Sequence, residues 1–180
     1  GTHGRKGNAV ITPDVADALN IHMGREFGAH FQYLSLSGWF DGEGLPELAG
    51  FFATQAAEEH MHAMKFWRYV QDAGATLAIP GVDAPRAGFT SADDAVSAAL
   101  EWEIAVTRHI DDLVGLSRQH NDYATETFLH WFVTEQVEEV ATMTQLQQVV
   151  RRAGEANLLL VEDYVARKLA RGGGAEAGAE

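Results

Sequence analysis

The chain has 180 residues, a formal net charge of −13 at pH 7 and no cysteine. The lack of cysteine excludes disulfides, thiolate metal sites and cysteine nucleophiles, and it favours a cytoplasmic protein. The acidic balance argues against nucleic-acid binding, because phosphate contacts need a basic face, and it suits a protein that gathers cations. The sequence shows no signal peptide and no apolar run of 18 residues, so we expect no membrane segment.

Capping residues, prolines and glycines divide the chain into four long helices and a short one. The long helices are predicted from Thr12 to about residue 40, from Pro46 to about 74, from Ser91 to about 117 and from Asp122 to about 154. The short helix is predicted over residues 156–170, and no stretch alternates as a strand would. We expect residues 1–11 to form an N-terminal extension and 171–180 a disordered tail.

Long helices in one domain favour an all-α four-helix bundle. The links between the first and second helices and between the third and fourth are short, which suits antiparallel neighbours. The link between the second and third helices, "GATLAIPGVDAPRAGFT", is long enough to run the length of a bundle. The sequence therefore predicts a bundle with one long crossover between helices 2 and 3 and a short fifth helix.

Acidic residues and histidines interrupt the apolar seam of each long helix, where spacings of three and four alternate. They are Glu26 and His30 in the first helix, Glu59 and His62 in the second, Glu103 in the third, and Glu135 and Glu139 in the fourth. No seam position is Lys or Arg, so the seams supply no cation for a structural ion pair.

Five carboxylates in one core would need cations among them or raised pKa values. Burying an unpaired charge costs roughly several kcal/mol, and a whole domain is stable by only about 5–15 kcal/mol. Glu59 and His62, three residues apart, share a helix face. A Glu-x-x-His pair with single glutamates on facing helices is typical of a carboxylate-bridged dimetal site, and this donor set suits iron or manganese.

Several stretches resemble bacterial non-haem ferritin, a family of the ferritin-like diiron type: "REFGAHFQYL", "QAAEEHMHAMKF", "ALEWEIAV", "FLHWFVTEQVEEVATM" and "IPGVD". The resemblance covers residues 12–170. It implies a ferritin-like diiron domain in a homo-oligomeric cage, expected to be a 24-mer. It also implies a ferroxidase that oxidises ferrous iron with O2 or H2O2 and stores ferric mineral inside the cage.

The resemblance also implies a role for each matching residue. Glu26 and His62 would hold the first iron, Glu59 would bridge, and Glu103 and Glu139 would hold the second iron with Gln136 beside it. Tyr33 matches a tyrosine near the diiron centre that could donate an electron, and Trp131 matches a nearby tryptophan. A third iron site would use Glu58, Glu135, Glu138 and Glu139.

Two departures from bacterioferritin argue against haem. Bacterioferritins have a second Glu-x-x-His in the fourth helix, where this chain has Gln136 to Glu139. They also bind haem through a methionine directly after the bridging glutamate, where this chain has His60. We therefore expect iron and no haem.

Several residues keep a second interpretation. His30 is either an added ligand or, as we favour, a hydrogen-bonded core histidine. His60 faces solvent or a neighbouring subunit, Tyr33 could be core packing, and Glu58 and Glu138 could be solvated. His120, Asp122 and Glu126 either line a channel, or Asn121 or Asp122 caps the fourth helix with acids in its first turn.

Alternative functions are a bacterioferritin-like protein, a DNA-protecting mini-ferritin, a rubrerythrin-like diiron oxidoreductase and a non-catalytic shell. Rubredoxin-type cysteines and a basic tail are absent from the sequence. The apolar side of the fifth helix, through Leu158, Leu159 and Val161, would pack at a fourfold axis of a cage.

Overall fold

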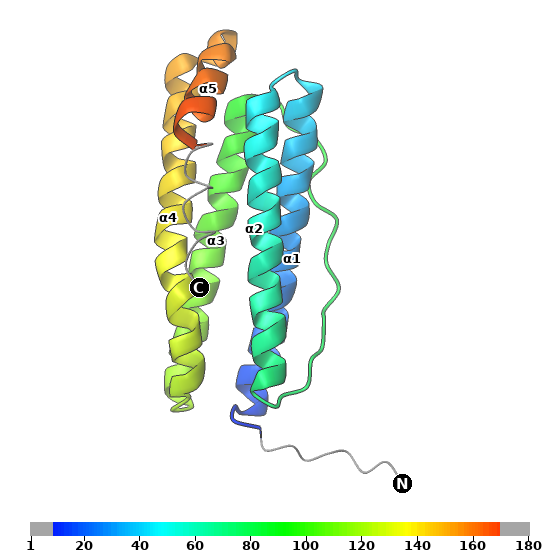
Figure 1. The fold of residues 1–180 in the computed structure, drawn as a ribbon, viewed down its shortest axis with the longest axis vertical. Coiled ribbons are helices and arrows are strands. Elements are labelled where there is room, and N and C mark those ends of the chain that lie inside the picture. The colour runs from blue at the N-terminus through cyan, green and yellow to red at the C-terminus, as the bar shows by residue number, and fades with distance from the viewer. Residues whose placement is uncertain (1–8, 170–180) are drawn as a thin grey trace.

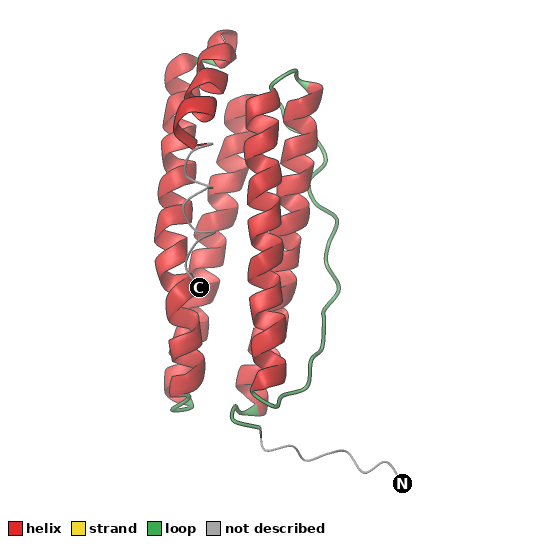
Figure 2. Ribbon diagram, viewed as in Figure 1, coloured by secondary structure: helices red, strands yellow, loops and turns green. Residues whose placement is uncertain are grey.

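The computed structural model describes residues 9–169, so the predicted tail at 171–180 and most of the N-terminal extension lie outside the described residues. Four long helices run side by side (Figure 1): α1 (Pro13–Gly42), α2 (Pro46–Asp72), α3 (Ala92–Gln119) and α4 (Tyr123–Ala153). A 3-10 turn (Glu155–Asn157), a short α5 (Leu158–Tyr164) and a π-helical segment (Val165–Leu169) follow. The described residues form no strand (Figure 2). This confirms the all-α bundle and its short fifth helix.

Local side-chain caps start three of the long helices where the sequence predicts. The hydroxyl of Thr12 accepts a hydrogen bond from the backbone of α1, and Pro13 occupies the first helical position. Ser91 caps α3 by accepting from the Asp94 amide at 3.0 Å, and Asp122 caps α4. Because these signals lie within a few residues of each helix start, the starts agree closely with the prediction.

The crossover between α2 and α3 runs along the outside of α1 from one end of the bundle to the other (Figure 1). Asn20 anchors its beginning by donating to the Thr76 carbonyl at 2.9 Å and accepting from the Ala78 amide at 3.1 Å. Gly24 lets it approach closely, because a Cβ there would lie 2.3 Å from Cγ of Pro80. The predicted single crossover is confirmed.

Two apolar clusters fill the bundle, one on each side of a polar layer. In α1, one cluster reaches up to Met23 and the other begins at Ala29, with Glu26 between them. The other three helices show the same arrangement, since Glu59, Glu103 and Glu139 each lie between residues of the two clusters. The apolar clusters therefore hold the four helices in register around the polar layer.

Two glutamates attach the C-terminal segment to the bundle. Glu162 of α5 accepts hydrogen bonds from the Glu47 and Leu48 amides at 3.0 and 2.8 Å, so it caps α2, whose own N-cap residue makes no side-chain bond. Glu155 likewise accepts from the first two amides of α3. Carboxylates at helix N-termini are favourable because the amides there have no partner within the helix.

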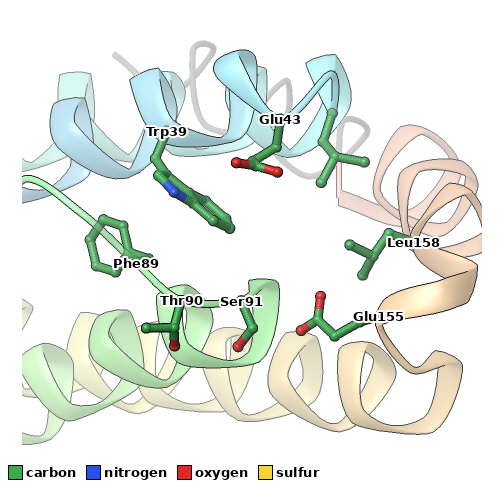
Figure 3. Close-up of a pocket in the computed structure, with 8 residues that line it drawn as sticks. Trp39, Glu43, Phe89, Thr90, Ser91, Glu155 and Leu158 are labelled. Atoms are coloured by element: carbon green, nitrogen blue, oxygen red, sulfur yellow. The ribbon is translucent and has the colours of Figure 1, made fainter.

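The outward side of α5 keeps its leucines exposed. Leu159 and Leu160 are 76% and 65% exposed, whereas Val161 is buried against the bundle. A cavity of about 290 Å³ opens beside this segment, between Trp39, Phe89 and Leu158 (Figure 3). Its lining shares no residue with the polar layer. Within residues 9–169, no helix is both long and apolar enough to cross a membrane.

Candidate metal centre

Six polar side chains of the predicted centre are buried in the polar layer and come from all four long helices. They are Glu26 of α1, Glu59 and His62 of α2, Glu103 of α3, and Gln136 and Glu139 of α4, with exposed fractions between 0% and 4%. All but Gln136 are acids or a histidine. The register assumed from the seams therefore brings together the four glutamates and His62, and Gln136 joins them from beside the predicted α4 seam.

The first group of potential ligands consists of Glu26, Glu59 and His62, each of which offers one atom within 4.8 Å of the other two. Nδ1 of His62 lies 3.2 Å from Oε2 of Glu59 and 3.6 Å from Oε2 of Glu26. The ring also packs edge-on against Trp131, with centroids 5.3 Å apart. One nitrogen and two carboxylates thus converge on one point.

The second group consists of Glu59, Glu103 and Glu139, again with one ligand atom each within 4.8 Å. Because Glu59 belongs to both groups, its carboxylate lies beside both candidate metal positions. A carboxylate in this position is what a dimetal site uses as a bridge.

Two hydrogen-bond donors fix the Glu103 carboxylate. The Tyr33 hydroxyl, fully buried, donates to Oε1 at 2.5 Å, and the Gln136 amide donates to Oε2 at 3.0 Å. The same amide lies 3.1 Å from the Thr107 hydroxyl, a partner that sequence reasoning missed. Tyr33 and Gln136 therefore orient a potential ligand, whatever else they do.

Burial and mutual repulsion raise the pKa values of three of the four buried carboxyls. Burial, together with the charges of Glu103 and Glu26, raises the pKa of Glu59 well above its usual range. Burial and the charges of Glu103 and Glu58 raise the pKa of Glu139 to about 10. Burial also raises the pKa of Glu103, although its donors partly offset this effect. Without a cation, the layer must hold protons.

Glu26 behaves differently from the other three. Burial opposes its ionisation too, but the neighbouring His22 and His62 outweigh that effect and hold the pKa of Glu26 below its usual range. Burial lowers the pKa of His62, but the adjacent Glu26 carboxylate outweighs burial and raises it. The centre therefore combines one carboxyl whose pKa is lowered with three whose pKa values are raised.

The donor set fits a divalent transition metal. With the carboxyl groups ionised, Oε2 of Glu26, Oε1 of Glu59 and Oε2 of Glu139 have no hydrogen-bond partner among the described residues. Buried acceptors without partners are costly, and a cation would satisfy them. Carboxylate and imidazole donors without thiolate suit iron or manganese better than structural zinc.

A third group lies beside the centre and includes Glu58, Glu135 and Glu139. Glu58 and Glu135 are only partly buried, so the prediction of five buried carboxylates is wrong for Glu135. Its place in the α4 seam belongs to Gln136, one position further round the helix. Glu138 is exposed and belongs to none of the three groups found among residues 9–169.

The histidines outside the centre make other contacts. His30 donates Nδ1–H to the Ala56 carbonyl at 2.6 Å, as the hydrogen-bonded interpretation predicts. His60 is exposed and meets the His30 ring edge-on, with centroids 5.5 Å apart. Neither belongs to a ligand group.

The start of α4 agrees with the capping interpretation of the suspected channel residues. Asp122 accepts from the amide and hydroxyl of Thr125 at 2.9 and 2.6 Å. Glu126 accepts from Arg118 at 2.7 Å, and His120 lies 3.8 Å from Asp14. A channel at this end stays a prediction.

Sequence reasoning missed His22. It is fully buried, and its Nε2 lies 2.9 Å from Oε1 of Glu26. The signal that could have found it is the spacing of four residues from Glu26, which places both side chains on one helix face.

Comparison with known proteins agrees with the fold. A model of the ferritin-like domain of the Ferritin family matches residues 16–153. "Ferritin BfrB" of Mycolicibacterium smegmatis is 43% identical over 148 residues, which cover 82% of this chain and 81% of that protein. "Bacterial non-heme ferritin" of Staphylococcus aureus is 35% identical over 151 residues, covering 83% and 91%.

A solved structure is similar over nearly the whole described chain. The open pore ferritin of the hyperthermophilic archaeon Archaeoglobus fulgidus superposes with a TM-score of 0.85 at 33% identity, covering 89% of this chain and 99% of that one. The resemblance to bacterial non-haem ferritin is thus confirmed, and the chain belongs to the ferritin family.

Proposed function

We propose that this ferritin-family chain is an iron-storage protein with ferroxidase activity. It binds two ferrous ions at the buried carboxylate layer, oxidises them and passes ferric iron to a mineral. The observation that carries the proposal is the membership of Glu59 in two ligand groups that share one buried layer. A single structural metal ion would need only one such group.

The donor set favours oxidation of the bound iron. Anionic carboxylates stabilise Fe(III) more than Fe(II), because the higher charge gains more from each oxygen ligand. Two ferrous ions supply the two electrons that reduce O2, with two protons, to H2O2, or H2O2, with two protons, to two waters. Iron is both substrate and cargo in this reaction.

Each residue then has a defined task. Glu26 and His62 bind the first ferrous ion, Glu103 and Glu139 bind the second, and Glu59 bridges them. Gln136 orients Glu103 through its amide. Tyr33 donates a hydrogen bond to the same carboxylate and, in this proposal, also donates an electron to the iron centre.

Release of ferric iron uses the third group. Glu139 belongs to both the second and the third groups, so it can pass an ion toward the partly buried Glu58 and Glu135. Glu138, exposed on the same helix, would receive it next. The mineral then grows inside a homo-oligomeric cage, for which we propose 24 subunits on the strength of the family.

The test replaces two residues of the first group. The double variant Glu59→Ala, His62→Ala should assemble normally but lose rapid Fe(II) oxidation, followed as the rise in ferric absorbance after mixing with air-saturated buffer. Glu101→Gln is the matched control, because Glu101 is an exposed acid of α3 two residues from Glu103. Wild-type rates in the double variant would refute the assignment of the centre.

A further inference from the structure

His22 is a buried, titratable side chain that the proposed chemistry does not use. It is 0% exposed, and its ring packs against Phe66 with centroids 4.8 Å apart. Its Nε2 lies 2.9 Å from Oε1 of Glu26, and its Nδ1 has no hydrogen-bond partner among the described residues. If this position only had to be filled, an apolar side chain would stabilise the bundle more than histidine, because it leaves no buried nitrogen without a hydrogen bond.

The contact assigns the proton on the ring. An ionised carboxylate oxygen only accepts, so the nitrogen facing Oε1 of Glu26 is the one that carries hydrogen. In a neutral ring, Nδ1 is then the nitrogen without hydrogen. Turning the ring over would lose the bond to Glu26, so the bond and the packing on Phe66 together hold one ring orientation.

The hydrogen bond from His22 makes the two oxygens of Glu26 different. Oε1 is taken by His22, whereas Oε2 has no hydrogen-bond partner and lies 3.6 Å from Nδ1 of His62. Without His22, the carboxylate could rotate about its last side-chain bond and offer either oxygen, or both, to an ion. With His22 in place, one defined oxygen faces the first ligand group.

We propose that His22 is a positioning residue for the first metal site, whose Nε2–H fixes Glu26 so that Oε2 alone binds the ferrous ion. The inference rests on the proposed function, since it assumes that Glu26 is a ligand. His22 itself touches no ion in this account. Partners of this kind, one bond behind a ligand, typically change metal affinity by about 10- to 100-fold when removed.

The test compares two substitutions under anaerobic conditions with Co(II) as the probe, because its visible absorption reports affinity and coordination together. His22→Gln keeps an N–H donor that reaches a carboxylate four residues away. His22→Leu keeps similar bulk and removes the donor. His109→Leu is the matched control, since His109 is a partly buried histidine of α3 outside the ligand groups.

We expect His22→Leu to weaken binding of the first Co(II) by about 10- to 100-fold and to change its absorption bands, because Glu26 can then bind through both oxygens. His22→Gln should bind the first Co(II) nearly as tightly as wild type, with wild-type bands, and the His109 control should match wild type. A purely structural role would not rescue the bands with glutamine. Wild-type affinity and bands in His22→Leu, or equal losses in both His22 variants, would overturn the proposal.

Crystals of the wild-type protein soaked with Co(II) keep the proposal testable if His22→Leu does not assemble. The expected result is one bond from Oε2 of Glu26 to the ion, with the His22 contact to Oε1 intact. Two Glu26 oxygens on the ion would overturn the proposal. Failure of the proposed function is a different result, in which the wild-type protein binds no Co(II) at Glu26, Glu59 and His62.

Discussion

Filling the centre with two divalent ions should release protons to the solvent, because the metal-free layer holds protons on carboxyls that a metal needs ionised. Glu59, Glu103 and Glu139 all have raised pKa values, and burial is the largest cause for each. The perturbation is the addition of two equivalents of Zn(II), which excludes redox chemistry. The comparison is the same titration in the Glu139→Gln variant, which has no proton to lose at that position.

The magnitude follows from the shifted pKa of Glu139. With a pKa of about 10, this carboxyl is essentially fully protonated at pH 7. It therefore contributes about one proton per subunit, and Glu59 and Glu103, whose pKa values are also raised, add to that number. Each released proton makes the apparent affinity rise about tenfold per pH unit, or about 1.4 kcal/mol. We expect the wild type to release about one proton per subunit more than the variant, because only the wild type carries the Glu139 proton.

Isothermal titration calorimetry in two buffers of different ionisation enthalpy measures the number of protons released. This number is the difference between the two binding heats divided by the difference between the two ionisation enthalpies. Repeating it between pH 6 and 8 gives the slope of affinity against pH. The exposed Glu101→Gln variant should match wild type. Release of less than half a proton per subunit, with a flat pH dependence, would refute the claim that the metal-free layer is protonated.

Three further outcomes follow from the structure. The folded pKa of Glu139 lies above its unfolded value of 4.5, so the metal-free protein should lose stability as pH rises from 4.5 toward 10, by about 1.4 kcal/mol per pH unit for this group. A chelator-treated protein whose melting temperature rises between pH 6 and 8 would contradict this. Gly24→Ala should destabilise the bundle by about 1–3 kcal/mol, because the added Cβ would overlap Pro80. An unchanged melting temperature would show that the crossover moves away from α1 at no cost in stability. Glu162→Ala should remove the cap of α2 and lower the free energy of unfolding by about 1 kcal/mol. Amide hydrogen exchange should become faster in α5 and stay the same in α1. Equal α5 exchange in the variant and the wild type would mean that apolar contacts alone hold α5.

The helices and their order could be predicted because their signals are local. Thr12, Ser91 and Asp122 each accept a hydrogen bond from the amide three residues ahead, so nearby residues determine where each of these helices starts. The crossover could be predicted from length alone, since a link of that size has to span a bundle or leave it. Neither inference needed knowledge of a contact between distant segments.

The facing of α4 was harder to predict because it depends on helix rotation. A seam with alternating steps of three and four admits Glu135 or Gln136 at the same layer, since Phe132 and Glu139 belong to either choice. The packing of α4 against α3 decides for Gln136, whose amide reaches the Glu103 carboxylate. That contact joins residues 33 positions apart, which the periodicity of α4 alone does not encode.

His22 was missed for a related reason. Spacing alone gives no reason for a histidine next to the buried Met23 to lie inside the bundle. Its burial comes from Phe66 of α2, which covers the ring. Only the four-residue interval to Glu26 pointed to it, and that interval gains meaning once Glu26 is known to be buried.

The central claim is that Glu59 bridges two iron ions in one buried layer, and anomalous diffraction measures this directly. Crystals soaked anaerobically with Fe(II) and recorded on both sides of the iron absorption edge should show two peaks about 3.5–4 Å apart. One peak should lie among Glu26, Glu59 and His62, and the other among Glu59, Glu103 and Glu139. A single peak, or iron bound only at exposed acids such as Glu138 with the buried layer empty, would contradict the account.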